Sequence, residues 1–154
     1  MATFVTTSIV IQRPVEEVFA FATDARNNRQ WQSRSGLQRS QQLPEEPVGV
    51  GTRISEVFKF MGIESESSSE VTEYEPNRKY TRRTISGPSP IKEGTLTFEP
   101  AADGARLTAN LHVQAGGLFA IAEPMLASNL KRGFDGAFAT LKALLEEHTA
   151  ARAR

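Results

Sequence analysis

The chain of 154 residues contains no cysteine. Disulfide bonds, thiolate-bound zinc, iron–sulfur clusters and a cysteine nucleophile are therefore excluded. The sequence also lacks an opening basic-plus-apolar segment, and no apolar run approaches the roughly 18 residues that a membrane helix needs. These absences favour, by default, a cytoplasmic protein without integral membrane contact.

A net charge is missing as well, because 18 basic and 18 acidic side chains cancel. Without a bulk positive field we expect no nucleic-acid partner. There are only two histidines, His112 and His148, and neither has the serine and acid context of a hydrolase triad. Metal-ligand spacing is absent too, so the sequence predicts no metal site and no cofactor.

The composition that remains is ordinary for a globular protein, with 39% hydrophobic and 23% charged residues. A chain of this length buries enough surface for one hydrophobic core. We therefore expect a single domain over residues 1–149, followed by a frayed tail at 150–154.

The order of the predicted elements points to one architecture. Residues 3–12 alternate as a strand, and Pro14 opens a short helix with an apolar stripe. The pair Thr23 and Asp24 supplies a cap for a second short helix that ends near Trp31. Further strands are predicted at 52–60, 63–74, 79–86, 91–99 and 105–113. Apolar residues then repeat at three and four over 124 to about 148, which predicts a long amphipathic helix. An antiparallel sheet wrapped around that helix is the economical α+β packing.

Five segments in this order resemble one protein family. They are IQRPVEEVFAFATDARNNRQWQS, GVGTRISEVFKFMG, EVTEYEPNRKY, GTLTFEPAADGARLT and LKALLEE. Together they are similar to the bacterial polyketide cyclase/dehydrase family of the START-like (SRPBCC) superfamily, from about residue 4 to 147. The resemblance implies the helix-grip fold, in which a curved seven-stranded antiparallel sheet surrounds the C-terminal helix and an internal cavity holds a hydrophobic small molecule. Members include aromatase/cyclases and lipid carriers, so the fold does not decide the activity.

The stretch GIESESSSEVTEYEP, at 62–76, is unusual for a strand because it offers so little to a core. Alternation places Ser65, Ser67 and Ser69 on one face and most of its glutamates on the other. Several carboxylates of like sign cannot be buried together, so the serines face inward. Small hydroxyls leave space, and the hypothesis is a roomy, partly polar cavity wall. The alternatives are a poorly packed strand end or a register shifted by a bulge.

Glu56 is the acid most suited to chemistry, since it shares a face with Ile54 and Phe58 and so points into the apolar interior. Left unpaired there, it would serve as a proton acceptor or donor near neutral pH. The alternative is a carboxylate satisfied by a neighbour. Tyr80 and Arg82 share a face of the strand 79–86, and Arg82 stands where the family usually has an apolar residue. It would pair with Glu56, hold a ligand oxygen, or lie in solvent after a bulge.

The remaining candidate ligand contacts are aromatic, apolar or small polar side chains that the pattern turns inward. The full set is Trp31, Ile54, Phe58, Phe60, Ser65, Ser67, Ser69, Leu96, Phe98, Leu111, Met125, Asn129 and Phe134. Simple packing beneath the second helix is the alternative for Trp31, and a solvent-exposed edge of the helix is the alternative for Asn129.

Three functions follow from these observations. The leading hypothesis is a carrier or sensor that encloses a hydrophobic, weakly polar small molecule, and that acts as a monomer or weak homodimer. The second is a polyketide cyclase/dehydratase-type enzyme with Glu56 as base, Tyr80 as acid and Arg82 stabilising an enolate. The third is a protein-interaction module in which the exposed glutamates of 63–74 contact a basic partner.

Overall fold

The computed structural model describes residues 3–33, 36–43, 48–60, 62–114 and 123–152. Seven strands and three α-helices, with a short 3-10 helix η1, make up this part of the chain. In chain order they are β1 (Thr3–Ile11), α1 (Val15–Ala22), η1 (Ala25–Asn27), α2 (Asn28–Gln32), β2 (Leu37–Leu43), β3 (Arg53–Phe60), β4 (Ile63–Glu75), β5 (Lys79–Ser86), β6 (Ile91–Ala101), β7 (Gly104–Val113) and α3 (Glu123–Arg152).

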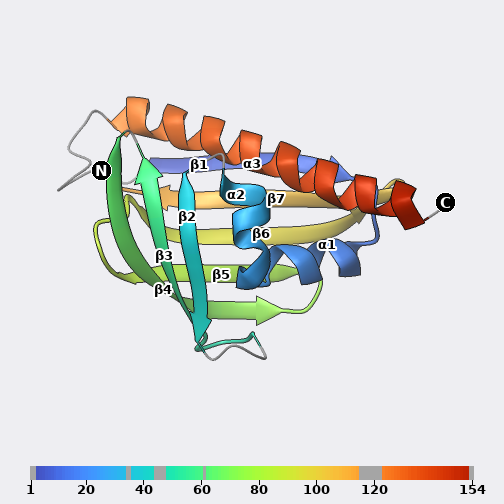
Figure 1. Cartoon of the computed structure of the whole chain (residues 1–154), viewed down its shortest axis with the longest axis horizontal. Coiled ribbons are helices and arrows are strands. Elements are labelled where there is room, and N and C mark those ends of the chain that lie inside the picture. The colour runs from blue at the N-terminus through green and yellow to red at the C-terminus, as the bar shows by residue number, and fades with distance from the viewer. Residues whose placement is uncertain (1–2, 34–35, 44–47, 61, 115–122, 153–154) are drawn as a thin grey trace.

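The strands form one antiparallel sheet in the order β1-β7-β6-β5-β4-β3-β2. Only β1 is out of sequence order, because it pairs with the last strand, with Thr3 opposite Val113. The sheet curves, and α3 runs across its concave side (Figure 1). The predicted helix-grip architecture, with two short helices after the first strand, is confirmed.

Two elements differ from the sequence-based expectation. The seventh strand, β2, was implied by the family resemblance but no pattern located it. Leu37 at its start is buried, but the inward positions after a bulge are Ser40 and Gln42, while Leu43 is exposed, so the strand lacks the apolar alternation of an ordinary core strand. Helix α3 extends to Arg152, past the expected end near residue 148 and into the residues predicted as a tail.

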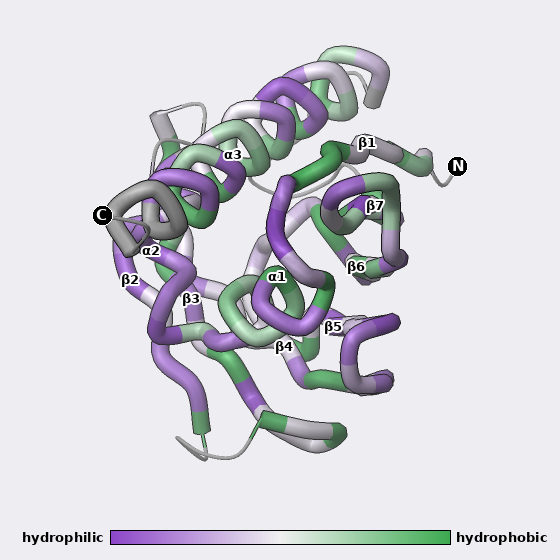
Figure 2. The backbone as a smooth tube through the Cα atoms, turned by 90° about the vertical axis from the view of Figure 1, so that its right-hand side faces the viewer, coloured by the Kyte–Doolittle hydropathy of each residue, from purple (hydrophilic) through white to green (hydrophobic). Residues whose placement is uncertain are grey.

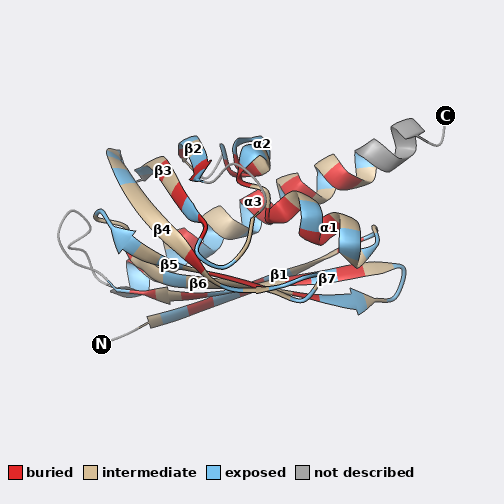
Figure 3. Cartoon of the chain, turned by 90° about the horizontal axis from the view of Figure 1, so that it is seen from below, coloured by how far each residue is buried: buried red, intermediate tan, exposed pale blue. Residues whose placement is uncertain are grey.

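The core lies between the concave face of the sheet and the helices (Figure 3). Phe19 of α1 makes edge-to-face contacts with Phe98 of β6 and Tyr74 of β4, with ring centroids 5.0 and 5.4 Å apart. Seen from one end, α1 lies within the arc of the strands and α3 lies across its open side (Figure 2). One end of the interior is therefore filled by α1.

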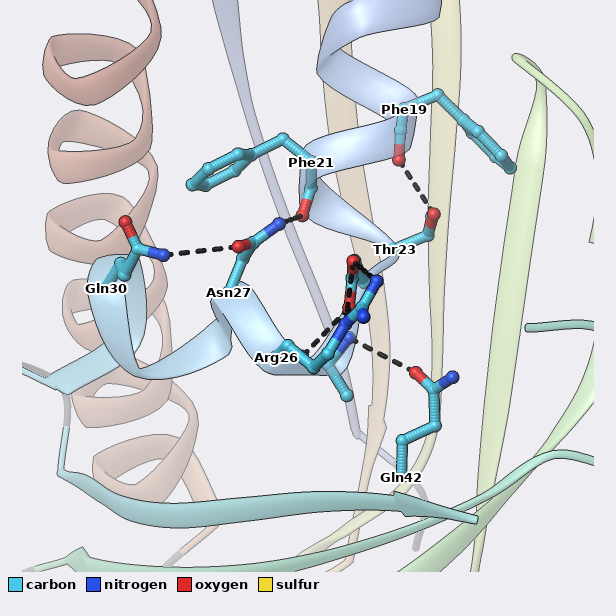
Figure 4. Close-up of polar contacts among 9 residues, drawn as sticks. Phe19, Phe21, Thr23, Arg26, Asn27, Gln30 and Gln42 are labelled. Atoms are coloured by element: carbon cyan, nitrogen blue, oxygen red, sulfur yellow. Dashed lines mark hydrogen bonds and ion pairs between the residues drawn. The ribbon is translucent and has the colours of Figure 1, made fainter. Parts of the chain in front are cut away.

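Polar contacts fix the short helices over the sheet. Of the two residues predicted to supply the cap, Asp24 caps η1 by accepting a hydrogen bond from the backbone N–H of Arg26 at 3.0 Å, whereas Thr23 ends α1. Asn27 Nδ2 donates to a carbonyl of α1 at 3.3 Å, and Ala25 N–H donates to Gln42 Oε1 of β2 at 3.3 Å (Figure 4). Because α2 follows directly, these contacts determine where its side chains enter the interior.

Helix α3 is attached to the edge strand β1 by polar contacts. Lys142 Nζ donates to Val10 O at 2.8 Å, and Thr7 Oγ1 donates to Asp135. At the other side of the sheet opening, α3 packs on α2 and α2 packs on β2. The two helices thus bridge the gap between the two edge strands.

Candidate functional site

A cavity of about 160 Å³ lies between the concave sheet face and helices α2 and α3. All three candidate catalytic residues, Glu56, Tyr80 and Arg82, border it. Eight of the predicted ligand contacts also lie on its wall: Trp31, Phe58, Ser65, Ser67, Ser69, Leu96, Asn129 and Phe134. Residues from α2, β3, β4, β5, β6 and α3 therefore meet around one space.

Three other predicted contacts, Ile54, Phe98 and Leu111, are buried in the core but are not among the described residues that line the cavity. Phe98 shows why, since it packs against α1, where the interior is already filled. The expectation that Met125 lies on the inner side of the last helix is wrong, because its side chain is 57% exposed. It precedes the buried Leu126 by one residue, which is about 100° around a helix. The side chain of Phe60 lies outside the described part of the structure.

The serines of β4 form a polar strip on the cavity wall. Ser67 lies opposite Glu56 in the register of β3 and β4, and Ser65 lies opposite Phe58. A register shift between Ser68 and Ser69 marks a bulge against β5, and Ser68 also borders the cavity. The inward serines and the bulge, proposed as alternatives from the sequence, therefore occur together.

The glutamates of β4 lie on the opposite, convex face beside basic residues. Glu64 is the register partner of Lys59, and Glu70 is the partner of Arg53 on β3 and of Arg83 on β5. Opposite charges across neighbouring strands offset one another. The convex face thus presents alternating signs of charge rather than one acidic surface.

Glu56 and Arg82 form an ion pair at the cavity wall, with Nη2 of Arg82 donating to Oε1 at 3.0 Å. Glu56 is 6% exposed, and its other oxygen Oε2 accepts from Asn28 Nδ2 at 3.3 Å and from Ser40 Oγ at 3.4 Å. Of the environments considered for Glu56, the structure shows the carboxylate satisfied by its neighbours. For Arg82, pairing with Glu56 is the arrangement found.

Tyr80 stands next to Arg82 on the same inward face of β5 and is 5% exposed. Burial raises the pKa of Tyr80 to about 12, and the nearby Arg82 only partly opposes that rise. The phenol therefore holds its proton firmly at neutral pH. It is suited to donating a hydrogen bond and poorly suited to giving up the proton.

Trp31 fits both interpretations of its role, packing beneath the second helix and contact with the cavity. Its ring stacks on Phe138 of α3, with centroids 6.2 Å apart and an interplanar angle of 25°, and it also borders the cavity. Asn129 borders the cavity while its Nδ2 donates to Met125 O at 3.0 Å.

Sequence reasoning missed Asn28 and Ser40, the two neutral partners of Glu56. Asn28 precedes Trp31 by three residues, so the helical spacing that turns Trp31 inward also turns Asn28 inward. That signal was present in the sequence. For Ser40 there was none, because its strand carries no apolar alternation.

The described residues contain no cluster of histidine, aspartate or glutamate arranged to hold a metal ion. Among the described helices, none is both long and apolar enough to cross a membrane.

Comparison with known proteins gives a consistent picture. A sequence family described as polyketide cyclase/dehydrase and lipid transport matches residues 2–146. A START superfamily protein from Mycobacterium smegmatis has a TM-score of 0.78 at 15% identity, covering 94% of this chain and 97% of that one. Protein TTHA0849 from Thermus thermophilus has a TM-score of 0.76 at 18% identity, covering 91% and 94%.

A third similar structure is the di-domain aromatase/cyclase StfQ from the steffimycin biosynthetic pathway, with a TM-score of 0.75 at 15% identity. The alignment covers 97% of this chain but 52% of StfQ, so this chain spans about half of that protein. At these identities the structural likeness establishes the fold alone. No curated protein matches the chain.

Proposed function

The chain belongs to the family of polyketide cyclase/dehydrase and lipid transport proteins, and on that premise we propose that it binds a hydrophobic, weakly polar small molecule in its internal cavity as a carrier or sensor. The cavity itself carries the proposal. Well-packed cores leave few voids larger than a water molecule, whereas the cavity of this protein has a volume of about 160 Å³. Its wall combines aromatic side chains such as Phe58 and Phe134 with the small hydroxyls of β4.

The volume sets the size of what is enclosed. An engineered apolar cavity of about 150 Å³ accommodates benzene. The guest of this protein is therefore one ring or a short alkyl chain, or the buried end of a larger molecule.

Ligand-induced stabilisation tests the proposal. A molecule that binds only the folded state raises the melting temperature by mass action. We expect ring-sized apolar compounds to raise it and to displace a fluorescent apolar dye. A panel of such compounds, lipids and polyketides that gave neither a shift nor displacement would contradict the proposal.

A cavity-filling variant makes the test specific. Ser65→Leu places additional apolar atoms on the cavity wall, so ligand-induced stabilisation should be lost while the protein remains folded. Glu64→Leu is the matched control, because it introduces the same side chain one residue earlier on the exposed face. Equal ligand binding by both variants would place the guest elsewhere.

Catalysis in the same cavity is the second candidate, supported by the presence of Glu56, Tyr80 and Arg82 on one wall. Both oxygens of Glu56 already accept hydrogen bonds from protein side chains, and the raised pKa of Tyr80 disfavours release of its proton, which is why binding is preferred. Turnover of a poly-β-ketone analogue that falls at least about a hundredfold in Glu56→Gln would favour the enzyme.

A further inference from the structure

A second hollow lies along the outer flank of α3, the helix that runs across the open side of the sheet (Figure 2). It is an open groove of about 420 Å³. Its described lining residues all belong to this one helix: Arg132, Gly133, Gly136, Ala139, Thr140, Ala143, Leu144 and Glu147. We call it the α3 groove. No other described element contributes to its lining, so this flank of the helix has no partner within the described chain.

The floor of the α3 groove is shallow and its polar groups are already satisfied. A Cβ added at Gly136 would meet nothing within 4 Å, and Ala139 and Ala143 are exposed. Thr140 Oγ1 donates to Gly136 O at 3.1 Å, so this hydroxyl needs no outside partner. Short side chains let the axis of a second helix come close. Covering the floor would therefore bury apolar surface without leaving a hydroxyl unpaired.

The charges on α3 say what would cover it. Between positions 124 and 147, four charged side chains neutralise one another at a spacing of four residues, in the pairs Lys131–Asp135 and Lys142–Glu146. The other two, Arg132 and Glu147, form no ion pair with a described residue. They have opposite signs and border the two ends of the α3 groove. A complementary partner must present an acid at one end and a base at the other.

The α3 groove is itself such a partner. A point between Ala139 and Thr140 is equally far from both charges, which lie roughly 22 Å apart along the helix. In an antiparallel pair of helices related by a two-fold axis through that point, Arg132 of one copy faces Glu147 of the other at both ends. A parallel pair would set like charges against each other, which disfavours it.

We propose that the α3 groove is a self-association surface, through which two copies of the chain pair by antiparallel packing of α3 against α3. Arg132 and Glu147 meet across the interface at each end, and the short side chains between them form the contact. One helix from each copy buries less than the roughly 1,200 Å² of a stable interface, so the dimer is weak and exchanges with the monomer. The inference does not depend on what the internal cavity binds.

Sedimentation velocity measures this association directly. An interface of this size predicts a dissociation constant on the order of 100 µM, so the dimer fraction should grow between about 10 µM and about 1 mM protein. Arg132→Glu and Glu147→Arg should each weaken the dimer about tenfold, because each variant places like charges together at both ends of the interface. Both side chains are exposed, so neither change should affect folding.

A charge exchange tests the antiparallel arrangement. The double variant with Arg132→Glu and Glu147→Arg restores opposite charges at both ends and should regain the original dissociation constant to within about threefold. In a parallel pair the same double variant would still oppose like charges. Arg78→Glu is the matched control, since it makes the same charge change at an exposed position between β4 and β5 and should leave the dimer unaffected.

Gly136→Gln tests the floor independently of the charges. The longer side chain enters open space in the monomer, where glutamine is also a better helix former than glycine, but it blocks close approach of a second helix. The dimer should weaken about tenfold while circular dichroism shows a folded protein. A chain that stays monomeric at every concentration would overturn the inference, as would a dimer that neither charge reversal weakens. Failure of the double variant to restore association would overturn the antiparallel pairing.

Discussion

Glu56 and Arg82 are each costly to bury alone and are held together at the cavity wall. Removing one member of a buried ion pair leaves an uncompensated charge. We expect Arg82→Met to lower the free energy of unfolding by about 3 kcal/mol, measured by urea denaturation. The hydrogen bonds from Asn28 and Ser40 to Glu56 remain, which keeps the loss at the lower end of the usual range.

A double mutant provides the control for that prediction. Glu56→Leu combined with Arg82→Met replaces both charges by apolar groups and should recover part of the lost stability, because Asn28 and Ser40 then lose Glu56 as an acceptor. Losses that simply add in the double mutant would show that the two side chains do not interact energetically.

Tyr80 gives the protein a specific sensitivity to alkaline pH. Its pKa is raised from 10.0 to about 12 by burial, so the unfolded chain loses the phenol proton before the folded protein does. The free energy of unfolding should therefore fall as the pH rises from 10 to 12, by about 2–3 kcal/mol from this group. Below pH 10 the contribution is fully present.

Tyr80→Phe isolates the effect in urea titrations at a series of pH values. The variant has no phenol proton to lose at this position, so its stability should decline less steeply than that of the unaltered protein between pH 10 and 12. Parallel declines would mean that the phenol is not buried in solution.

The orientation of a single side chain could be predicted from the sequence wherever its residue lies on a regular strand. Alternation turned Glu56, Tyr80 and Arg82 to the inner face, and the structure places all three on the cavity wall. Their hydrogen-bond partners were not predictable in the same way, because pairing between distant elements depends on register. The prediction for Met125 is wrong because it relied on the hydrophobicity of the side chain, whereas the helical spacing places that residue outside the inner stripe of α3.

At the scale of elements, α3 contains two glycines that lie in different environments. Gly133 borders the cavity, whereas a Cβ added at Gly136 would meet nothing within 4 Å. Gly136→Ala should raise the free energy of unfolding by roughly 0.5–1 kcal/mol, because alanine loses less backbone entropy in a helix.

Gly51→Ala is the contrasting control, measured in the same urea titrations. It has equal room for a Cβ, but its φ of 95° is unfavourable for other residues, so the substitution should destabilise the protein. If both variants moved stability in the same direction, backbone conformation would not explain the difference.

Most elements that sequence reasoning located have a hydrophobic period, as in β1 and α3, whereas β4 was located by the strand and turn signals on either side of it. Strand β2 has no hydrophobic period, because beyond the buried Leu37 its interior positions hold Ser40 and Gln42, which donate to Glu56 and accept from the backbone of η1 respectively. The polar side chains of β2 hydrogen-bond to particular partners. Because they occupy positions that are usually apolar, the hydrophobic alternation that indicates a strand is missing. The bulge in β4 was foreseen only as an alternative, since a local register shift leaves little trace in residue types.

For the whole molecule, one core joins both ends of the described chain, because β1 pairs with β7 and packs on α3. We expect residues 1–149 to unfold as one cooperative domain. The fluorescence of Trp31, the sole tryptophan, and far-UV circular dichroism should then report the same urea midpoint. Separate midpoints would show that the helices detach before the sheet.

The gap between the edge strands β1 and β2 has a mechanical consequence. A closed barrel widens only by rupturing a ladder of backbone hydrogen bonds, whereas here α2 and α3 complete the circumference. Expansion of the interior requires mainly that packed side chains slide past one another. The contacts between such side chains have little directional preference. The size of the ligand that the protein can accommodate is therefore limited by how tightly α2 and α3 pack, not by the rigidity of the sheet.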